Sequence, residues 1–386
     1  MCSWESGQDM MKRWGWNQTY GGDRSSRIIR APEHQAAMAH AAGVMAAFAE
    51  HLKKPQSEVA KWREVVDRHV KLTASLYRKE ENWFCDFNSE AKVWQSGCND
   101  DGPAVGTAGA GKQTYQLAPL FFHSPALGVD LLQGISPAAV AEMVDAVSNP
   151  MKFGSDPPGS LTFAKHCQES LSNPRCVTNI WAPHPFITIS SAGNVNHSQQ
   201  ASDATKRLLD RVFGKMDART RTHFDVGHGT FGSTTSPSSP YPGVSYECLT
   251  INYTNASSGL QVPPMEQSCG AEDYAWTGEA TTVQLIREIV GFREHHALGA
   301  DASILRPALP GAAEGETYTV RGLTYRGTRF DLHYEVGGGG MLGVRVEDSA
   351  GKRKAVVASM RNAADEAHIS VTSDAFTVAL QQVAFK

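Results

Sequence analysis

The sequence predicts a mainly helical protein of two domains, with helix hairpins in residues 1–298 and an antiparallel β-sandwich in residues 299–386. Two observations predict this division. Apolar residues recur at helical spacing in the first part of the chain, and they alternate with polar residues in the last part. A chain of 386 residues is long enough for one large domain and a smaller one.

The first helix pair is predicted between residues 33 and 78. Two helices separated by a proline are typical of an αα-hairpin, and we expect the apolar face of each helix to build the core. The first face consists of Met38, Ala41, Met45, Phe48 and Leu52, and the second, after Pro55, consists of Val59, Trp62, Val66, Val70 and Leu76.

A third helix is predicted from Ala138 to Val147. Ser136 and Pro137 directly precede it, and they are typical of a helix N-cap followed by proline at the first helical position. The apolar spacing turns three side chains inward. These are Val140, Met143 and Val144.

Two more helices are expected near residues 202–216 and 279–296. The stretches 148–200 and 225–278 are rich in Gly, Pro, Ser and aromatic residues, and we expect them to be irregular loops that are longer than ordinary connections. Long ordered loops on a helical scaffold often carry the functional residues.

The last part of the chain predicts a β-meander followed by further strands. Alternating apolar residues run from Tyr318 to Val336 and are interrupted at Gly322 and Gly327. Gly337 to Gly340 predict a turn. The further strands are expected at Leu342–Val346, Ala355–Ser359, His368–Thr372 and Phe376–Leu380. We expect this domain to pack against the helical domain.

The composition argues against two classes of partner. The net charge is −4, and 36 Lys and Arg residues are interspersed with 40 Asp and Glu residues, so the sequence forms no basic stripe that would bind nucleic acid. No run of eighteen apolar residues occurs, which predicts no membrane span. The first residues lack the basic and apolar regions of a signal peptide.

Other features favour the secretory pathway. Four triplets, beginning at Asn17, Asn196, Asn252 and Asn255, fit the N-glycosylation pattern. Six of the seven cysteines form sequence-local couples, which are either disulfides or ordinary reduced thiols. The couples are Cys85 with Cys98, Cys167 with Cys176, and Cys248 with Cys269.

The segment Trp4-Glu5-Ser6-Gly7-Gln8-Asp9 resembles the ESGxD element of the helical-toroid glycosidases, the clan that contains glycoside hydrolase family 63, mannosylglycerate hydrolase-like enzymes and the trehalases. The resemblance implies that Asp9 is the general acid and that Glu5 binds sugar, with Trp4 and Gln8 beside them. A carboxylic acid that its surroundings keep protonated is the chemistry that glycosidic cleavage needs. Without the resemblance, the hexapeptide would also fit an acidic helix start with core tryptophans.

Later motifs follow the order of the same clan. The helix pair followed by Asn82–Phe87 resembles its two helices and short aromatic strand, and Tyr115–Leu120 resembles the loop that follows. Asn179–Pro183 stands where the clan has a Trp-Arg-Gly-Pro-like stretch and also resembles the Trp-Ala-Pro run of trehalases. The arginine is missing, but Trp181 is a candidate stacking platform, and a structural tryptophan is an equal alternative.

The second carboxylate is expected late in the helical domain. Tyr246-Glu247 resembles the clan's Tyr-Glu-x-Tyr stretch, which implies that Glu247 is the general base. Gly270–Gly278 resembles the segment that opens its last helix, with Trp276 matching and Glu272 nearby. Because the alignment between the two segments needs an insertion, Glu272 stays open as a rival base as well as a sugar-binding residue.

The resemblance implies an inverting glycoside hydrolase that acts on an α-glucoside or related oligosaccharide. It implies an (α/α)6 toroid, the six-hairpin fold, that is incomplete at its N-terminus because few residues precede Asp9. The alternative is a catalytically incompetent fragment or carbohydrate-binding remnant. Phosphorolysis would need a cationic phosphate pocket, for which the sequence shows no clear cluster.

We expect no cofactor and no metal. Gly106–Gln113 matches GxxxxGK but ends in glutamine where a nucleotide site needs Ser or Thr, and no strand precedes it. His223 and His228 lie in loop-like sequence without a further clustered ligand.

Overall fold

The structure is a computed structural model that describes part of the chain. The described residues are 29–90, 92–94, 118–145, 179–181, 183–213, 248–250, 253–254, 261–262, 282–293, 302–325, 327–348, 354–371 and 376–381.

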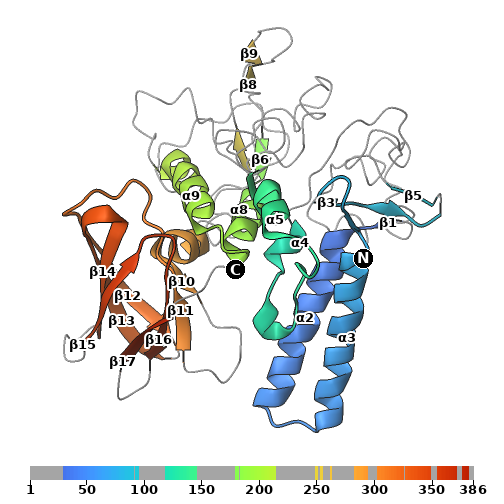
Figure 1. The fold of residues 1–386 in the computed structure, drawn as a ribbon, viewed down its shortest axis with the longest axis horizontal. Coiled ribbons are helices and arrows are strands. Elements are labelled where there is room, and N and C mark those ends of the chain that lie inside the picture. Colours follow the sequence, from blue (N-terminus) through green and yellow to red (C-terminus); the bar gives the residue numbers. More distant parts are fainter. Residues whose placement is uncertain are drawn as a thin grey trace, which may run out of the picture.

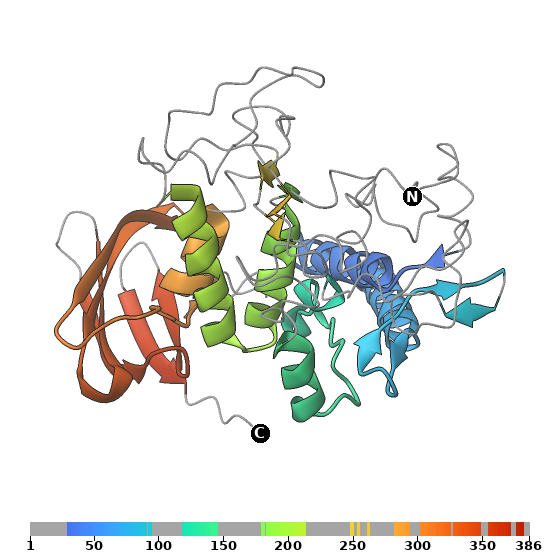
Figure 2. The same cartoon turned by 90° about the horizontal axis from the view of Figure 1, so that it is seen from above.

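The described elements form a row of helices with β-sheets at one end (Figures 1 and 2). Helices α2 (Pro32–His51) and α3 (Gln56–Ala74) lie at the other end, and α8 (Pro183–Asn194) and α9 (Ser198–Phe213) lie next to the sheets. Short α4 (Ala118–Phe121) and α5 (Pro137–Asp145) lie between these pairs. The described helices close no ring, so the incomplete six-hairpin toroid stays a prediction.

The predicted hairpin of α2 and α3 is confirmed, but the prediction for the buried face of α2 was wrong. Ala36, Ala39 and Ala46 are fully buried, whereas the large residues of the expected face are exposed. The reason is close packing, because a Cβ at Gly43 would lie 2.9 Å from the Cβ of Leu127 in the 3-10 helix η3 (Pro125–Leu127). Only small side chains fit this contact. The exposed residues are Met38, Ala41, Met45, Phe48 and Leu52.

Helix α5 forms as predicted. The Ser136 Oγ accepts a hydrogen bond from the backbone N–H of Ala139 at 3.2 Å, as an N-cap does. Val140, Met143 and Val144 are buried in a core that α8 and α9 share. The hairpin of β2 (Tyr77–Arg78) and β3 (Trp83–Phe84) packs on the same core. A second small sheet contains β1 (Ile29–Arg30), β4 (Phe87–Asn88) and β5 (Val93–Trp94).

Helix α8 lies within the stretch 148–200, which the sequence predicted to be irregular, so this prediction was wrong for residues 183–194. Two prolines at the start of α8 and three β-branched residues inside it lower the helical propensity of this segment. Tertiary packing compensates, because Ile189 and Ala192 are fully buried. Helix α9 begins at Ser198, close to its predicted start near residue 202.

The predicted helix 279–296 is also too long. A helical turn at residues 282–284 continues as the π-helix η6 (Leu285–Val290) and ends at Gly291. Gly291 has a φ of 81°, and a Cβ there would overlap the carbonyl group of Arg306. The glycine therefore turns the chain sharply into a strand that packs against residue 306.

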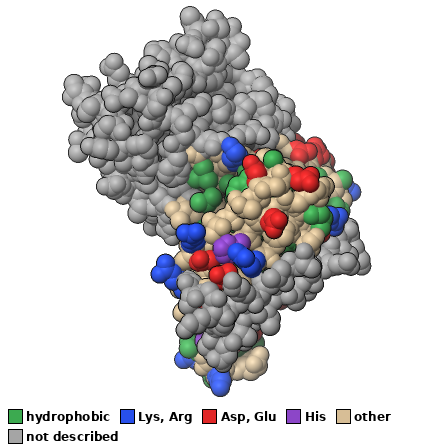
Figure 3. Space-filling view, turned by 90° about the vertical axis from the view of Figure 1, so that its left-hand side faces the viewer, with side chains coloured by type: hydrophobic (Ala, Val, Ile, Leu, Met, Phe, Trp, Pro, Cys, Tyr) green, Lys and Arg blue, Asp and Glu red, His purple; other side chains and the backbone are tan. Residues whose placement is uncertain are grey.

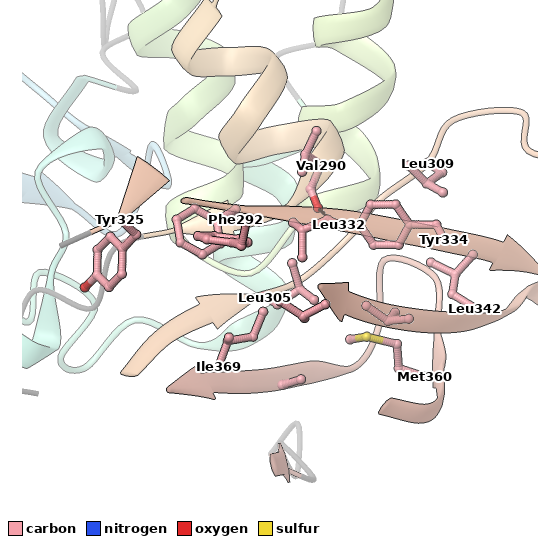
Figure 4. Packing of buried hydrophobic residues seen from close by; sticks show 14 of the residues in the cluster. Val290, Phe292, Leu305, Leu309, Tyr325, Leu332, Tyr334, Leu342, Met360 and Ile369 are labelled. Atoms are coloured by element: carbon pink, nitrogen blue, oxygen red, sulfur yellow. Dashed lines mark hydrogen bonds between the residues drawn. The ribbon is translucent and has the colours of Figure 1, made fainter. Parts of the chain in front are cut away.

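Two four-stranded antiparallel sheets share one core, which includes side chains from η6 (Figure 4). The Tyr334 hydroxyl is buried and donates to the Val290 carbonyl at 2.7 Å, which joins the sheets to η6. The first sheet contains β10 (Phe292–Arg293), β11 (Ala302–Leu305), β16 (Glu366–Val371) and β17 (Phe376–Gln381). The second contains β12 (Thr317–Tyr325), β13 (Thr328–Val336), β14 (Met341–Asp348) and β15 (Lys354–Arg361).

The predicted meander and turns are present in the second sheet. Strands β12 and β13 pair as neighbours, with a bulge at the position of Gly322. The turn at Gly338–Gly340 joins β13 to β14. The strand β10 precedes residue 298, where the sequence places the domain boundary.

Candidate functional site

The residues predicted for catalysis lie outside the part of the chain that the structure describes. These are Asp9 and Glu247, and the same holds for Trp4, Glu5, Gln8, Glu272 and Trp276. The phosphate-loop-like segment 106–113 and the two histidines at 223 and 228 also lie outside it.

Trp181 is the one predicted site residue whose backbone is described. It ends strand β6 (Asn179–Trp181), which pairs antiparallel with β7 (Cys248–Thr250). In this register the backbone of Trp181 lies opposite that of Cys248, the residue after Glu247 in the sequence. The strand that ends in Trp181 therefore pairs with the strand that directly follows Glu247 in the sequence. A second ladder joins β8 (Tyr253–Thr254) and β9 (Gln261–Val262).

The described residues line a cavity of about 720 Å³ where the helices meet the β-sheets. Its lining comes from the loop after α4, the turn between α8 and α9, η6, and strands β10, β11 and β12. Three arginines belong to this lining, namely Arg287, Arg293 and Arg306, whereas none of the described lining residues is Asp or Glu.

Arg293 and Arg306 each have a carboxylate partner behind the cavity wall. The Arg293 Nη2 donates to Glu288 Oε2 at 2.5 Å, and the Glu288 side chain is fully buried. The Arg306 guanidinium donates to the Glu366 carboxylate, of which 9% is exposed. The carboxylates fix the two guanidinium groups without presenting their own charge to the cavity lining.

Two asparagines at the α8–α9 turn accept hydrogen bonds from Arg287 and Arg306. Asn194 donates its amide to the Phe121 carbonyl at 2.5 Å and accepts from Arg287 at 2.8 Å. Asn196 Oδ1 accepts from Arg306 at 2.5 Å and has a φ of 70°. A non-glycine residue in this left-handed conformation is uncommon. The turn therefore presents both amide oxygens to guanidinium groups.

Gly193 makes room for the buried ion pair. A Cβ on Gly193 would overlap the Glu288 carboxylate and would lie 2.5 Å from the Arg293 guanidinium. Any larger residue would displace the pair, because real Cβ atoms do not approach so closely. The absence of a side chain at Gly193 therefore allows the Glu288–Arg293 pair to pack against α8.

Two groups at the cavity have shifted pKa values. Burial lowers the pKa of the Arg306 guanidinium, which the nearby Glu366 opposes, and the charge of Arg293 lowers it further. Burial also lowers the pKa of His123, although Asp130 opposes the shift. The His123 Nδ1 accepts the Leu131 N–H at 3.2 Å, so His123 is neutral with its proton on Nε2.

The β-sheet end of the molecule presents charges of both signs, seen from the side in Figure 3. On the second sheet, His333 lies 4.0 Å from Glu347, which also contacts Arg345 at 3.6 Å. This mixed surface has no single sign that would attract a charged polymer. Among the described residues, no group of His, Cys, Asp and Glu is arranged to hold a metal ion.

Two further observations bear on the sequence-based predictions. Cys85, in the buried core, forms a disulfide. Within the described ranges, every helix is too short or too polar to cross a membrane.

The sequence analysis missed the three arginines. Arg287 lies in η6, Arg293 lies in β10 and Arg306 directly follows β11, and only Arg287 and Arg293 are close in sequence. The sequence contained one signal of this cluster, which is the presence of charged residues within the apolar run Leu285–Phe292. Charged residues on a buried segment need partners.

No protein-family model and no curated protein sequence matches this chain.

Proposed function

We propose that the chain is an inverting glycoside hydrolase that cleaves an α-glucoside or a related linkage. In this proposal Asp9 protonates the leaving oxygen and Glu247 activates a water on the opposite face of the sugar ring. Trp181 and Trp276 stack on sugar rings, and Glu5, Gln8 and Glu272 donate or accept hydrogen bonds to hydroxyl groups.

The pairing of β6 with β7 is the observation that carries the proposal. The motif that ends in Trp181 and the motif that contains Glu247 are far apart in sequence, yet their neighbouring strands share a ladder. A glycosidase needs its stacking platform and its base around one sugar ring. The pairing supports that requirement, and the order of the motifs along the chain supports the choice of family.

The test is hydrolysis by the full chain and by single carboxylate variants. We expect Asp9→Asn and Glu247→Gln each to lower kcat on disaccharide α-glucosides by at least about 100-fold, because each removes proton transfer in the transition state. Glu80→Gln is the matched control, since Glu80 is a surface carboxylate that is 76% exposed. NMR of the first sugar released should show inversion at the anomeric carbon.

The rival base is tested by the same measurement. If Glu272→Gln abolishes turnover while Glu247→Gln does not, the two residues exchange roles. Near-normal turnover in Asp9→Asn would sink the assignment of the acid, and retention at the anomeric carbon would sink the inverting mechanism.

The alternative function is carbohydrate binding without turnover. The exposed apolar stripe of α2 favours it, because an incomplete ring of helix pairs would leave such a face without a neighbour. The stripe includes Met45 and Phe48, which are 42% and 46% exposed. Calorimetric titration with maltose and trehalose distinguishes the two functions, since a remnant binds sugar but releases no glucose.

A further inference from the structure

We propose that Asn196, in the turn between α8 and α9, carries an N-linked glycan. Asn196, His197 and Ser198 form one of the triplets that fit the N-glycosylation pattern. Of these triplets, this one lies entirely within the described part of the chain. A glycan at Asn196 is a modification of the protein, so the proposal goes beyond the glycosidase function and rests on no part of it.

The turn fixes the backbone of Asn196 directly after the end of α8. The N–H of Asn196 donates to the Gly193 carbonyl at 3.2 Å, and the N–H of His197 donates to the Ala192 carbonyl at 2.9 Å. Together with the φ of 70° at Asn196, these two hydrogen bonds form the Schellman motif that ends many helices. Glycine is usual at this position and asparagine also occurs there. The acceptor residue therefore lies in a tight turn at the end of a helix.

The side chain of Asn196 is exposed, as a glycan requires. Its Oδ1 accepts a hydrogen bond from Arg306 at 2.5 Å. Among the described residues, none accepts a hydrogen bond from its Nδ2. An N-linked glycan is bonded to Nδ2, so the fold keeps the contact with Arg306 when the sugar is attached.

Ser198 supplies the hydroxyl group of the triplet. Its side chain is only 2% exposed, and its Oγ makes no hydrogen bond within the described part of the chain. Burial in the folded protein is compatible with this role, because the glycan is transferred to the chain before folding. The described fold therefore gives the hydroxyl of Ser198 no hydrogen-bonding role of its own.

The disulfide of Cys85 supports the compartment that N-glycosylation needs. Disulfides form and persist in oxidising compartments, and the lumen of the endoplasmic reticulum is one of them. N-linked glycans are attached in the same lumen. A chain that forms its disulfide there therefore also meets the transferase.

The modification joins an amide nitrogen to a sugar. The Nδ2 of Asn196 forms a bond to the anomeric carbon of a lipid-linked oligosaccharide diphosphate, and the bond between that carbon and the diphosphate oxygen breaks. The nitrogen gives up one proton, and the lipid diphosphate leaves. Because Asn196 lines the cavity between the helices and the β-sheets, the glycan stands at the edge of that cavity.

The experiment is peptide mass spectrometry of the full chain, which an added cleavable signal peptide directs into the secretory pathway of cultured animal cells. Trypsin releases residues 176–206 as one peptide, which contains the triplet at Asn196 and no other. Peptide N-glycosidase in heavy-oxygen water converts a glycosylated asparagine into a labelled aspartate. We expect the label at Asn196 and none at Asn194 in the same peptide.

Ser198→Ala tests the triplet, because it removes the hydroxyl group and leaves Asn196 in place. It should abolish the label. Ser190→Ala is the matched control, since Ser190 is also buried and its Oγ also makes no hydrogen bond within the described residues. Ser190 lies outside the triplet, so its variant should keep the label. Asn196→Asp keeps an acceptor oxygen for Arg306 and should carry no glycan.

The chain retained in the cells is analysed together with the secreted chain. Because transfer precedes folding, a variant that does not fold still gives a result. The proposal is overturned if the peptide from the unmodified chain carries no label at Asn196. It is overturned equally if Ser198→Ala keeps the label, or if Ser190→Ala loses it as completely as Ser198→Ala does.

Discussion

Gly291 lies where the helices join the β-sheets, and a methyl group added there should lower the free energy of unfolding. Its φ of 81° suits glycine, and a Cβ there would overlap the Arg306 carbonyl group. The two chain segments are held together by Arg306 N–H donating to the Gly291 carbonyl at 2.9 Å and Ala308 N–H donating to the Ile289 carbonyl at 3.1 Å. Gly291→Ala must therefore separate the segments.

The cost of Gly291→Ala has two parts. An alanine in the left-handed conformation costs about 1–2 kcal/mol, and the two threatened hydrogen bonds contribute about 0.5–1.5 kcal/mol each. We therefore expect the free energy of unfolding to fall by roughly 2–5 kcal/mol. Gly311→Ala is the matched control, because Gly311 has a φ of 70° but no atom within 4 Å of its added Cβ. Gly311→Ala should therefore lower the free energy of unfolding only by the conformational cost of about 1–2 kcal/mol.

Urea unfolding followed by tryptophan fluorescence and by circular dichroism measures both variants. The informative quantity is the difference between Gly291→Ala and Gly311→Ala, since the conformational part cancels. A difference near zero would refute the reasoning, because the close contact with Arg306 would then have no energetic consequence.

Three further predictions concern other parts of the molecule. Tyr334→Phe should lower stability by about 1–3 kcal/mol in urea unfolding, because the buried Val290 carbonyl loses its donor. Burial lowers the pKa of His123, so the unfolded chain gains a proton first as the pH falls past about 6.5. Stability should therefore decrease between pH 7 and pH 5, and His123→Gln should reduce that slope; an unchanged slope would contradict this. Phe48→Gln should leave the free energy of unfolding, measured in urea, within about 0.5 kcal/mol of its unmodified value, because Phe48 is 46% exposed.

Local signals in the sequence were sufficient where a cap or an alternating pattern decides the structure. Ser136 and Pro137 start α5 because a hydroxyl oxygen and a fixed φ act within one turn of the chain. The strands after residue 315 follow the alternation of apolar residues, because each faces a core on one side. Such features depend on near neighbours, which a single sequence contains.

Packing between distant segments decided the elements that the sequence did not predict. On α2 the alanine face is buried because Gly43 approaches Leu127 in η3, and hydrophobicity alone favours the larger side chains on the opposite face. Helix α8 depends on the burial of Ile189, and the early end of η6 depends on contact between Gly291 and Arg306. The periodicity of residues within one segment gives no information on its contacts with distant segments.

The same distinction applies to the candidate sites. Each sugar-site motif could be found in the sequence because its residues are consecutive. The β6–β7 pairing adds only that the strand ending in Trp181 pairs with the strand that follows Glu247 in the sequence. The arginine cavity could not be found in this way. Its arginines lie in η6, in β10 and directly after β11, and the glutamate that fixes Arg306 comes from β16.

The location of the cavity explains why its arginines are held so firmly. Helix η6 and strand β11 meet at Gly291 and Arg306, so the backbone contact that joins the helices to the sheets also sets the positions of the guanidinium groups. Burying the Glu288–Arg293 pair there is stabilising only if its remaining polar atoms find partners.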